Sequence, residues 1–383
     1  MAKSGRLELL IMAFIGFAGI LDTSFMIPII ALYSESLGAS KAEAGFIAGF
    51  YSMVAIPASI AAGILVDRLG RKKMLVVGLL WDSLSVLLYS MVASSFQLLI
   101  VRGLHAIGGS LVYPAFIART REISGERVGY SVGRLLAPVA LAITLGTASA
   151  GFLTYMLGYR IPFIALSLII LLAGILALTL PERPEERSWR GLKGVVEGIR
   201  EASPSVISGL WLIIVLYVTL GIIVGGLATS ISGVVVPGER EARLLTGTGV
   251  SLSSLVAAVF LVLNGLVSDK RGVKLVILYS IAASTLGFIL PAAVLSPQTI
   301  LLGFIVFGIG LAGFLLSSTI LVTNVSAKAR GTTVGLQQVL NIVGIAVGAP
   351  AGGLLAAMGP HHVLIVAALI PLLAISVLVY SGS

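Results

Sequence analysis

Long apolar stretches alternate with short polar segments along the whole chain. A helix needs about 20 predominantly apolar residues to cross the hydrocarbon core of a bilayer. The pattern predicts twelve such helices, over residues 8–32, 42–66, 74–93, 96–119, 129–155, 160–180, 204–234, 243–268, 273–294, 297–323, 332–357 and 360–380. Helices satisfy their own backbone hydrogen bonds inside lipid. The sequence therefore predicts an all-α polytopic membrane protein.

Composition supports the membrane assignment. Apolar residues make up 58% of the chain and charged residues 11%, whereas a soluble domain contains about 25% charged residues. Too few polar side chains remain to cover a water-soluble globule, which excludes an ordinary soluble enzyme. The chain contains no cysteine, which excludes disulfides and thiolate metal sites. We expect no cofactor and no metal site.

Basic residues concentrate in alternate loops. Three of these loops contain Arg68, Arg71, Lys72 and Lys73; Arg119, Arg121 and Arg127; and Lys270, Arg271 and Lys274. Because basic loops face the cytoplasm, both termini are expected there, in a multi-pass protein of the plasma membrane. The net charge of +9 then reflects orientation beside anionic lipid and does not indicate nucleic-acid binding.

The sequence contains an internal repeat. A shift of 202 residues without gaps places Gly63, Asp67 and Gly70 on Gly265, Asp269 and Gly272, and it also matches four glycine pairs in later spans. Two parallel six-helix repeats are typical of transporters built by duplication. We expect an N-terminal six-helix bundle over 1–183, a cytoplasmic linker with an amphipathic helix over 184–203, and a C-terminal six-helix bundle over 204–383.

Three segments resemble one known family. The loop Gly63-x-x-x-Asp67-Arg68-x-Gly70-Arg71-Lys72 resembles the loop signature of the major facilitator superfamily. The segment from Arg102 to Gly108 is similar to the helix 4 motif of its proton-coupled members, with His105 in place of the usual Gln. The segment 28–38 resembles the end of helix 1 in twelve-helix drug:proton antiporters. In helix 5, Thr147 stands where the antiporter motif has Pro.

The resemblance implies the fold and the class of function. It implies the twelve-helix major facilitator fold, and a secondary active transporter that is not an enzyme and works by rocker-switch alternating access. We expect proton-coupled antiport that exports hydrophobic or amphipathic small molecules, by a monomer in contact with membrane lipid. One alternative is proton-coupled transport of an organic anion bound by Arg102, Arg134 and His105. A non-transport membrane protein, such as a membrane-bound enzyme or a receptor-like scaffold, is a third interpretation.

The signature loop predicts a conformational latch, meaning a contact that forms in one state of the transporter only. Asp67 ends a helix on the cytoplasmic side, where a carboxylate can stabilise the positive end of a neighbouring helix. The family arrangement implies that this neighbour begins near Gly331, Thr332 and Thr333. The repeat implies a second such contact between Asp269 and the helix that begins near Gly129. The candidate latch residues are Gly63, Asp67, Arg68, Gly70, Arg71, Lys72 and Asp269. A solvated basic loop that only sets topology is the alternative.

Charges inside predicted spans are costly, by at least about 2.5–3.5 kcal/mol each near the bilayer centre. They all lie in the N-terminal half: Asp22, Asp82, Arg102, His105 and Arg134. We expect Asp22 to carry the coupling proton, with Arg102 and His105 adjusting its protonation. Asp82 is expected to pair with Arg102 or Arg134 in a buried charge network. A structural ion pair is the alternative for Asp22 and Arg102. A structural role is the leading interpretation for Asp82 and Arg134 and an equal one for His105.

Polar side chains in other spans are candidates for a substrate cavity. Gln337 and Asn341 lie four residues apart and share a helix face with each other. Tyr33, Tyr113 and Tyr217 are further candidates, although an interfacial or packing role is the favoured interpretation for these three. Polar side chains of this kind also hydrogen-bond neighbouring helices, so both interpretations remain open.

Overall fold

A computed structural model of the chain describes residues 3–26, 29–39, 41–123, 127–182, 203–325 and 330–380. The expected amphipathic helix of the linker, and Pro28 of the helix 1 segment, lie outside these residues. The chain forms two compact units. Unit 1 comprises Met1–Ile123, Leu141–Glu201 and Val325–Val339, and unit 2 comprises Ser124–Ala140, Ala202–Asn324 and Leu340–Ser383.

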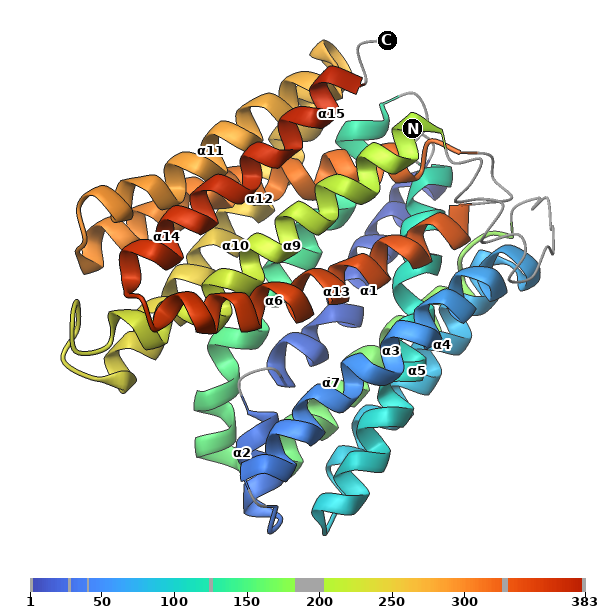
Figure 1. Ribbon diagram of the computed structural model, residues 1–383. Helices are drawn as coiled ribbons and strands as arrows, with labels where there is room; N and C mark the ends of the chain where they lie inside the picture. Colours follow the sequence, from blue (N-terminus) through green and yellow to red (C-terminus); the bar gives the residue numbers. More distant parts are fainter. Residues whose placement is uncertain are drawn as a thin grey trace. The chain divides into compact units, whose positions relative to one another are not determined.

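The helices of unit 1 come from the first repeat, apart from the start of α13. They are α1 (Lys3–Met26), α2 (Ile30–Ser36), α3 (Lys41–Leu69), α4 (Arg71–Tyr89), α5 (Ser95–Ile123), the later part of α6 (Val128–Leu157), α7 (Arg160–Leu178) and the first part of α13 (Arg330–Ala356). Helix α5 packs against α1, α3 and α4, and α7 packs against α1 and α4. Figure 1 shows α3, α4 and α5 side by side.

The helices of unit 2 come from the second repeat, apart from the start of α6. They are α9 (Pro204–Ile231), α10 (Glu239–Arg271), α11 (Val273–Ala293), α12 (Pro297–Val322), the later part of α13, α14 (Pro360–Leu369), the 3-10 helix η2 (Ile370–Ala374) and α15 (Ile375–Tyr380). Helix α12 packs against α9, α10 and α11, and α14 packs against α9 and α11. The contacts of unit 1 are thus repeated, as the internal duplication predicts.

The membrane-spanning prediction is confirmed for eleven helical segments of the described chain, which are long and apolar enough to cross a bilayer. The expected span 74–93 corresponds to α4, which is not among them. Its 19 residues include three basic residues in the first turn and Asp82 in the middle. These charges lower its apolar character, although α4 packs between α5 and α7 like its repeat counterpart α11 packs between α12 and α14.

Several expected helices end or bend differently. The segment 8–32 is interrupted, since α1 ends at Met26 and α2 begins at Ile30. The last span changes to the 3-10 helix η2 around Pro371, because proline removes a helical N–H donor. Gly70 and Gly272 occupy matching turns, with φ of 101° and 86°. Only glycine adopts such angles without strain, so each allows a helix to end and the next to begin at once.

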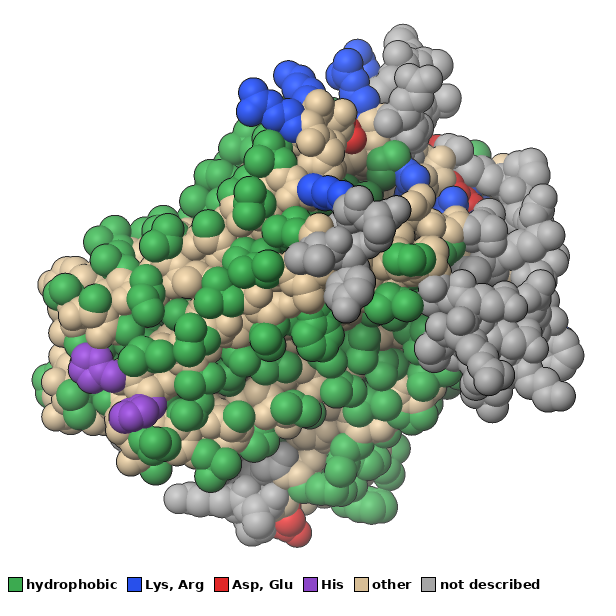
Figure 2. Space-filling model, turned by 45° about the horizontal axis from the view of Figure 1, so that its top comes forward, with side chains coloured by type: hydrophobic (Ala, Val, Ile, Leu, Met, Phe, Trp, Pro, Cys, Tyr) green, Lys and Arg blue, Asp and Glu red, His purple; other side chains and the backbone are tan. Residues whose placement is uncertain are grey.

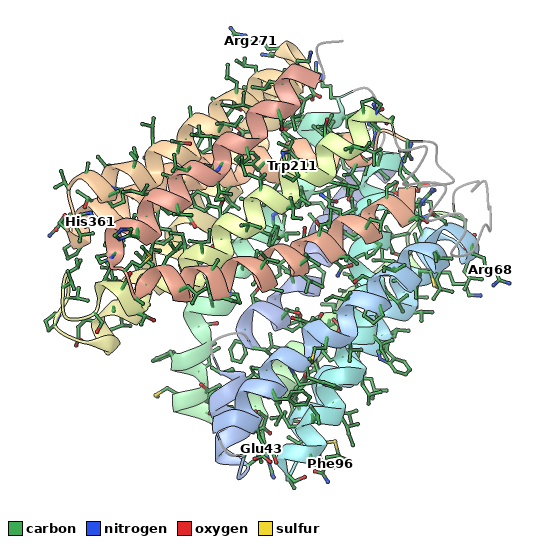
Figure 3. All side chains as sticks on the ribbon, in the orientation of Figure 1. Glu43, Arg68, Phe96, Trp211, Arg271 and His361 are labelled. Carbon is green, nitrogen blue, oxygen red and sulfur yellow. The ribbon has the colours of Figure 1, made fainter. Side chains whose placement is uncertain are left out.

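The surface is largely apolar. Figure 2 shows hydrophobic side chains over most of the visible face, with lysines and arginines gathered along one edge. In Figure 3, Arg68 lies at one end of the unit 1 helices, whereas Glu43 and Phe96 lie at the other. Within unit 2, Arg271 and His361 also lie at opposite helix ends. An apolar exterior of this extent suits contact with lipid chains, and the chain is a multi-pass membrane protein.

Candidate functional site

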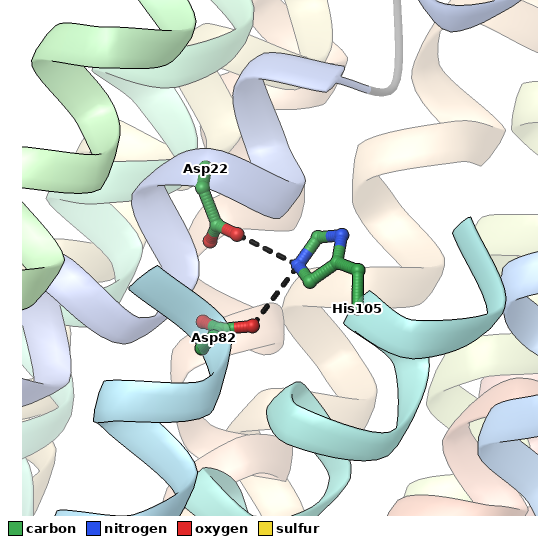
Figure 4. A group of neighbouring side chains, drawn as sticks. All are labelled: Asp22, Asp82 and His105. Atoms are coloured by element: carbon green, nitrogen blue, oxygen red, sulfur yellow. Dashed lines mark ion pairs between the residues drawn. The ribbon is translucent and has the colours of Figure 1, made fainter. Parts of the chain in front are cut away.

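Two carboxylates and one imidazole meet inside unit 1. The Nε2 atom of His105 on α5 lies 2.8 Å from Oδ2 of Asp22 on α1 and 3.2 Å from Oδ1 of Asp82 on α4. Figure 4 shows both carboxylates directed at this one ring nitrogen. All three side chains are at most 1% exposed. We call this group the charged triad.

Small residues bring the three helices close enough for the charged triad to form. A Cβ atom on Gly108 of α5 would lie 3.0 Å from the backbone nitrogen of Asp82, and one on Gly78 of α4 would lie 3.2 Å from the nitrogen of Val112. The indole of Trp81 also donates a hydrogen bond of 2.8 Å to the Leu104 carbonyl. Close approach of α4 and α5 therefore directs Asp82 toward α5.

Aromatic side chains and one arginine surround the charged triad. The Tyr89 hydroxyl lies 3.2 Å from Nδ1 of His105, and the Tyr51 ring meets the imidazole edge at a centroid distance of 5.0 Å. The Arg102 guanidinium lies 5.0 Å from the Tyr51 ring centroid. Arg102 also donates a hydrogen bond of 2.9 Å to the Ala48 carbonyl. With a protonated His105, two positive and two negative charges balance in this buried region.

The expected pairing of Asp82 with an arginine is wrong. Asp82 is paired with His105, while Arg102 binds the Ala48 carbonyl and covers Tyr51. Arg134 belongs to unit 2, where its guanidinium lies over the Tyr130 ring at 5.3 Å. Asp22 and His105 of the N-terminal repeat are in contact. The role of Asp22, Arg102 and His105 in proton coupling remains a prediction.

The charged triad also has the spacing of a small cation site. One ligand atom from each of the three residues lies within 4.8 Å of the other two, and carboxylates and imidazole are common metal ligands. However, Arg102 already supplies a positive charge beside Tyr51, and like charges repel strongly where water is excluded. A proton on His105 accounts for the same short distances, so we assign no metal here.

The first latch contact forms as predicted. Oδ2 of Asp67 accepts hydrogen bonds from the backbone N–H and the hydroxyl of Thr332, at 2.7 and 2.6 Å. Helix α13 begins at Arg330, so this N–H is one of the donors that lack a partner within the helix. Asp67 is only 7% exposed. A Cβ on Gly335 would lie 2.7 Å from the Ser59 carbonyl and 3.2 Å from Cα of Gly63, which explains the small residues at this crossing.

The second latch contact repeats the first. Oδ1 and Oδ2 of Asp269 accept hydrogen bonds of 2.7 and 2.8 Å from the backbone N–H groups of Gly129 and Tyr130, in the first turn of α6. A Cβ on Gly133 would lie 2.1 Å from the Leu261 carbonyl oxygen. The residue pairs of the two latches are related by the 202-residue shift. Both predicted contacts are therefore confirmed, whereas their function as latches is a proposal.

Other residues of the signature loop bind acidic partners. Arg71 is buried and its guanidinium pairs with Glu122 of α5. Lys72 lies 3.8 Å from Glu182, which is 86% exposed. Arg68 is an exposed residue of the last turn of α3. The loop therefore holds α4 to the end of α5 through Arg71, while its other basic side chains face outward.

A buried arginine at this end of unit 1 was missed from the sequence. Arg119, expected in a loop, is fully buried in α5. It pairs with Glu8 at 3.0 Å and Glu122 at 3.2 Å and donates a hydrogen bond of 2.6 Å to the Pro181 carbonyl. The sequence does contain one signal for a buried basic partner, namely Glu8 among leucines at the start of the first predicted span. Nearby, burial and then the positive charges of Arg71 and Arg121 lower the pKa of Arg330.

The five side chains predicted to line a substrate cavity differ in their burial and contacts. Tyr33 is buried, its hydroxyl donates to the Tyr89 carbonyl at 2.7 Å, and its ring stacks on Tyr159 at 4.2 Å. Gln337 is fully buried in unit 1, and Asn341 is half-buried in unit 2. Tyr113 and Tyr217 are half-buried. Tyr33 is therefore a packing residue, and a cavity role for the other four stays a prediction.

The second repeat lacks the charges of the first. A Cβ on Gly108 would approach the backbone of Asp82, and a Cβ on Gly310 would approach that of Ser284, which supports the same register in both units. In this register Asp22, Asp82, Arg102 and His105 correspond to Val224, Ser284, Phe304 and Phe307. The two phenylalanines instead pack with Phe288, at centroid distances of 6.0 and 4.7 Å.

The chain contains two repeats of membrane-spanning helices, and charged side chains are buried in one of them. This arrangement is typical of transporters built by duplication. The family model described as Major Facilitator Superfamily matches residues 12–237 and 218–382. The chain therefore belongs to the major facilitator superfamily, whose members are transporters and not enzymes.

Curated relatives match about half of the chain. Multidrug resistance protein 1 of Bacillus subtilis is 32% identical over 185 residues, 47% of this chain and 46% of that protein. An uncharacterized MFS-type transporter of Methanocaldococcus jannaschii is 30% identical over 162 residues, 42% of each chain. The quinolone resistance protein NorA of Staphylococcus aureus is 22% identical over 45% of each chain. The matched segment thus spans less than half the length of these relatives.

Solved structures support the fold over the whole chain. The transporter FucP in its outward conformation superposes with a TM-score of 0.81 at 11% identity, covering 100% of both chains. The human organic anion transporter MFSD10 (TETRAN) superposes with a TM-score of 0.71 at 16% identity, covering 98% of this chain and 99% of the other. The predicted all-α fold of two six-helix repeats is confirmed.

Proposed function

We propose that this transporter exports hydrophobic or amphipathic small molecules in exchange for protons, and that the charged triad carries the proton. The main support is the burial of Asp22, Asp82 and His105, which come from three different helices and are at most 1% exposed. Buried ionisable side chains in membrane helices are rare and mark ion or proton pathways. The drug-resistance names of two relatives support the substrate class.

The balance of buried charges around the charged triad can couple the proton to the substrate. With His105 protonated, its charge and that of Arg102 offset those of the two aspartates. Loss of the proton leaves one buried negative charge, which is costly away from water. A substrate with positive charge relieves this cost in one state of the transporter, and a proton relieves it in the other. Exchange of the two therefore avoids an unbalanced intermediate.

Alternating access supplies the conformational part of the proposal. We infer that the two latches, at Asp67 and Asp269, form in the state closed to the cytoplasm and break when the repeats rock. We also propose that the protein is a monomer in the plasma membrane. Both termini then lie in the cytoplasm, because its basic loops lie on one side of the predicted spans. Its partners are then the small-molecule substrate, protons and lipid.

The alternative of organic-anion transport has weaker support. It requires Arg102, Arg134 and His105 to bind one anion. The guanidinium of Arg102 already binds the Ala48 carbonyl and covers Tyr51, Arg134 lies over Tyr130 in unit 2, and His105 faces two carboxylates. An anion would meet these negative charges first.

Ethidium efflux from proteoliposomes tests proton coupling. We expect an imposed pH gradient to drive efflux and an ionophore that collapses the gradient to stop it. Asp22→Asn should abolish the effect of the gradient, because Asp82 and Arg102 then balance each other and His105 no longer needs a proton to offset a second carboxylate. Glu241→Gln is the matched control, since it neutralises an exposed carboxyl at the start of α10. Efflux that ignores the collapsed gradient contradicts proton coupling, and no efflux contradicts export of such compounds.

A further inference from the structure

Tyr89 contacts the ring nitrogen of His105 that the carboxylates do not. Its hydroxyl lies 3.2 Å from Nδ1, and both side chains are fully buried. The groups that face His105 are Asp22 from α1, Tyr51 from α3, and Asp82 and Tyr89 from α4, with Arg102 on its own helix α5 beyond the Tyr51 ring. Nε2 therefore faces only acceptors, and Nδ1 faces a hydroxyl.

These two environments assign the proton positions on the ring. A neutral imidazole has one N–H donor and one acceptor, and an imidazolium has two donors. Because Nε2 faces two carboxylates, it holds its proton in both forms. Nδ1 is then the atom that gains or loses a proton. A tyrosine hydroxyl can donate to an unprotonated nitrogen or accept from a protonated one.

We propose that Tyr89 is a positioning residue that holds His105 in place in both protonation states. Its hydroxyl donates to Nδ1 of the neutral ring and, after rotating, accepts from Nδ1–H of the charged ring. The imidazole then keeps its place between Asp22 and Asp82 when the proton arrives or leaves. This assignment rests on the proposed function, in which His105 takes part in proton coupling.

The surroundings hold Tyr89 itself in place. Its ring stacks on Phe163 with a centroid distance of 5.0 Å, and its backbone carbonyl accepts the hydrogen bond from the Tyr33 hydroxyl. Burial raises the pKa of Tyr33 to about 12, so that hydroxyl remains a donor at physiological pH. The Tyr89 side chain is thus fixed in position, while its hydroxyl hydrogen is free to rotate.

Removing the hydroxyl affects the two forms of His105 unequally. Tyr89→Phe keeps the ring and its packing, but takes away the acceptor of the charged ring and the donor to the neutral one. Hydrogen bonds to charged groups are roughly twice as strong as neutral ones. The charged form therefore loses more, and the titration midpoint of His105 moves to lower pH by about half to one unit.

Nitrogen NMR can follow this titration without a known substrate. The chain has three histidines, so a His361→Gln/His362→Gln background leaves His105 as the only signal in protein labelled with ¹⁵N-histidine and reconstituted in liposomes. We expect a neutral form protonated at Nε2 at high pH and an imidazolium at low pH. Tyr89→Phe should lower the midpoint, whereas the control Tyr279→Phe, which removes a hydroxyl that donates to Asn264 in unit 2, should leave it unchanged.

Three results overturn the assignment. The first is an equal midpoint in Tyr89→Phe and its parent, and the second is an equal shift in Tyr279→Phe. The third is a parent spectrum that shows the neutral proton on Nδ1 or shows no titration. If Tyr89→Phe does not fold, the spectrum of the parent protein still tests the assigned proton positions on His105. Efflux that ignores a pH gradient, together with the expected spectra, would contradict the proposed function while leaving the role of Tyr89 intact.

Discussion

Neutralising Asp67 is the most direct test of the latch proposal. The carboxylate accepts two hydrogen bonds of 2.7 and 2.6 Å from Thr332, at the first turn of α13. Asp67→Asn keeps the size of the side chain and one carbonyl oxygen, but removes the negative charge. The hydroxyl and N–H of Thr332, which share one carboxylate oxygen in the parent, are then left with a neutral acceptor.

The size of the effect follows from the position of the charge. A carboxylate at a helix N-terminus contributes up to about 2 kcal/mol where it is partly buried, and Asp67 is 7% exposed. If the contact exists in one conformational state only, its loss changes the ratio of the two states by about 30-fold, since each 1.4 kcal/mol is a factor of ten. A contact present in both states would instead cost stability without changing this ratio.

Spin labels can measure that ratio. The chain contains no cysteine, so exposed Lys73 and Lys274 can be replaced by cysteine and labelled without other changes. Electron–electron distances should show a second population that grows in Asp67→Asn. Glu182→Gln is the matched control, because Glu182 is 86% exposed and a surface pair contributes little. Distance distributions of Asp67→Asn that equal those of the control would refute the latch.

Two further changes test the packing at the latch ends of the helices. Gly133→Ala should lower the thermal unfolding temperature in detergent, because its Cβ would lie 2.1 Å from the Leu261 carbonyl oxygen. Gly247→Ala is the control, because Gly247 has open space around it. Equal unfolding temperatures of the two variants would contradict the close crossing of the helices. Arg119→Met should destabilise unit 1 by about 3–5 kcal/mol, since it removes a buried positive charge that pairs with Glu8 and Glu122. An unfolding midpoint in denaturant equal to that of the parent would contradict this.

Hydropathy and the internal repeat predicted the architecture well. Each apolar stretch corresponds to a helix because the bilayer requires long apolar helices. The family resemblance correctly paired Asp67 with the helix that begins near Thr332, and the repeat correctly paired Asp269 with the helix that begins near Gly129. Contacts of this kind follow from a motif and its copy. They require only that the ends of particular helices meet.

Side-chain partners inside the bundle were less predictable. Whether Asp82 faces Arg102 or His105 depends on the rotation and depth of α4 against α5, which the glycine contacts at Gly78 and Gly108 determine. No local pattern in the sequence encodes that packing. Arg119 was assigned to a loop because hydropathy marks the edge of the apolar stretch, whereas α5 continues to Ile123.

The two latches also constrain the order in which the chain can complete its fold during synthesis. Gly129 and Tyr130 find their carboxylate 140 and 139 residues later in the sequence, and Asp67 finds Thr332 after 265 residues. The first turn of α6 therefore lacks its carboxylate acceptor until Asp269 has left the ribosome, and Asp67 cannot bind Thr332 until α13 has been synthesised. Each latch joins residues of both repeats, so neither repeat can form a latch contact before the second repeat has been synthesised.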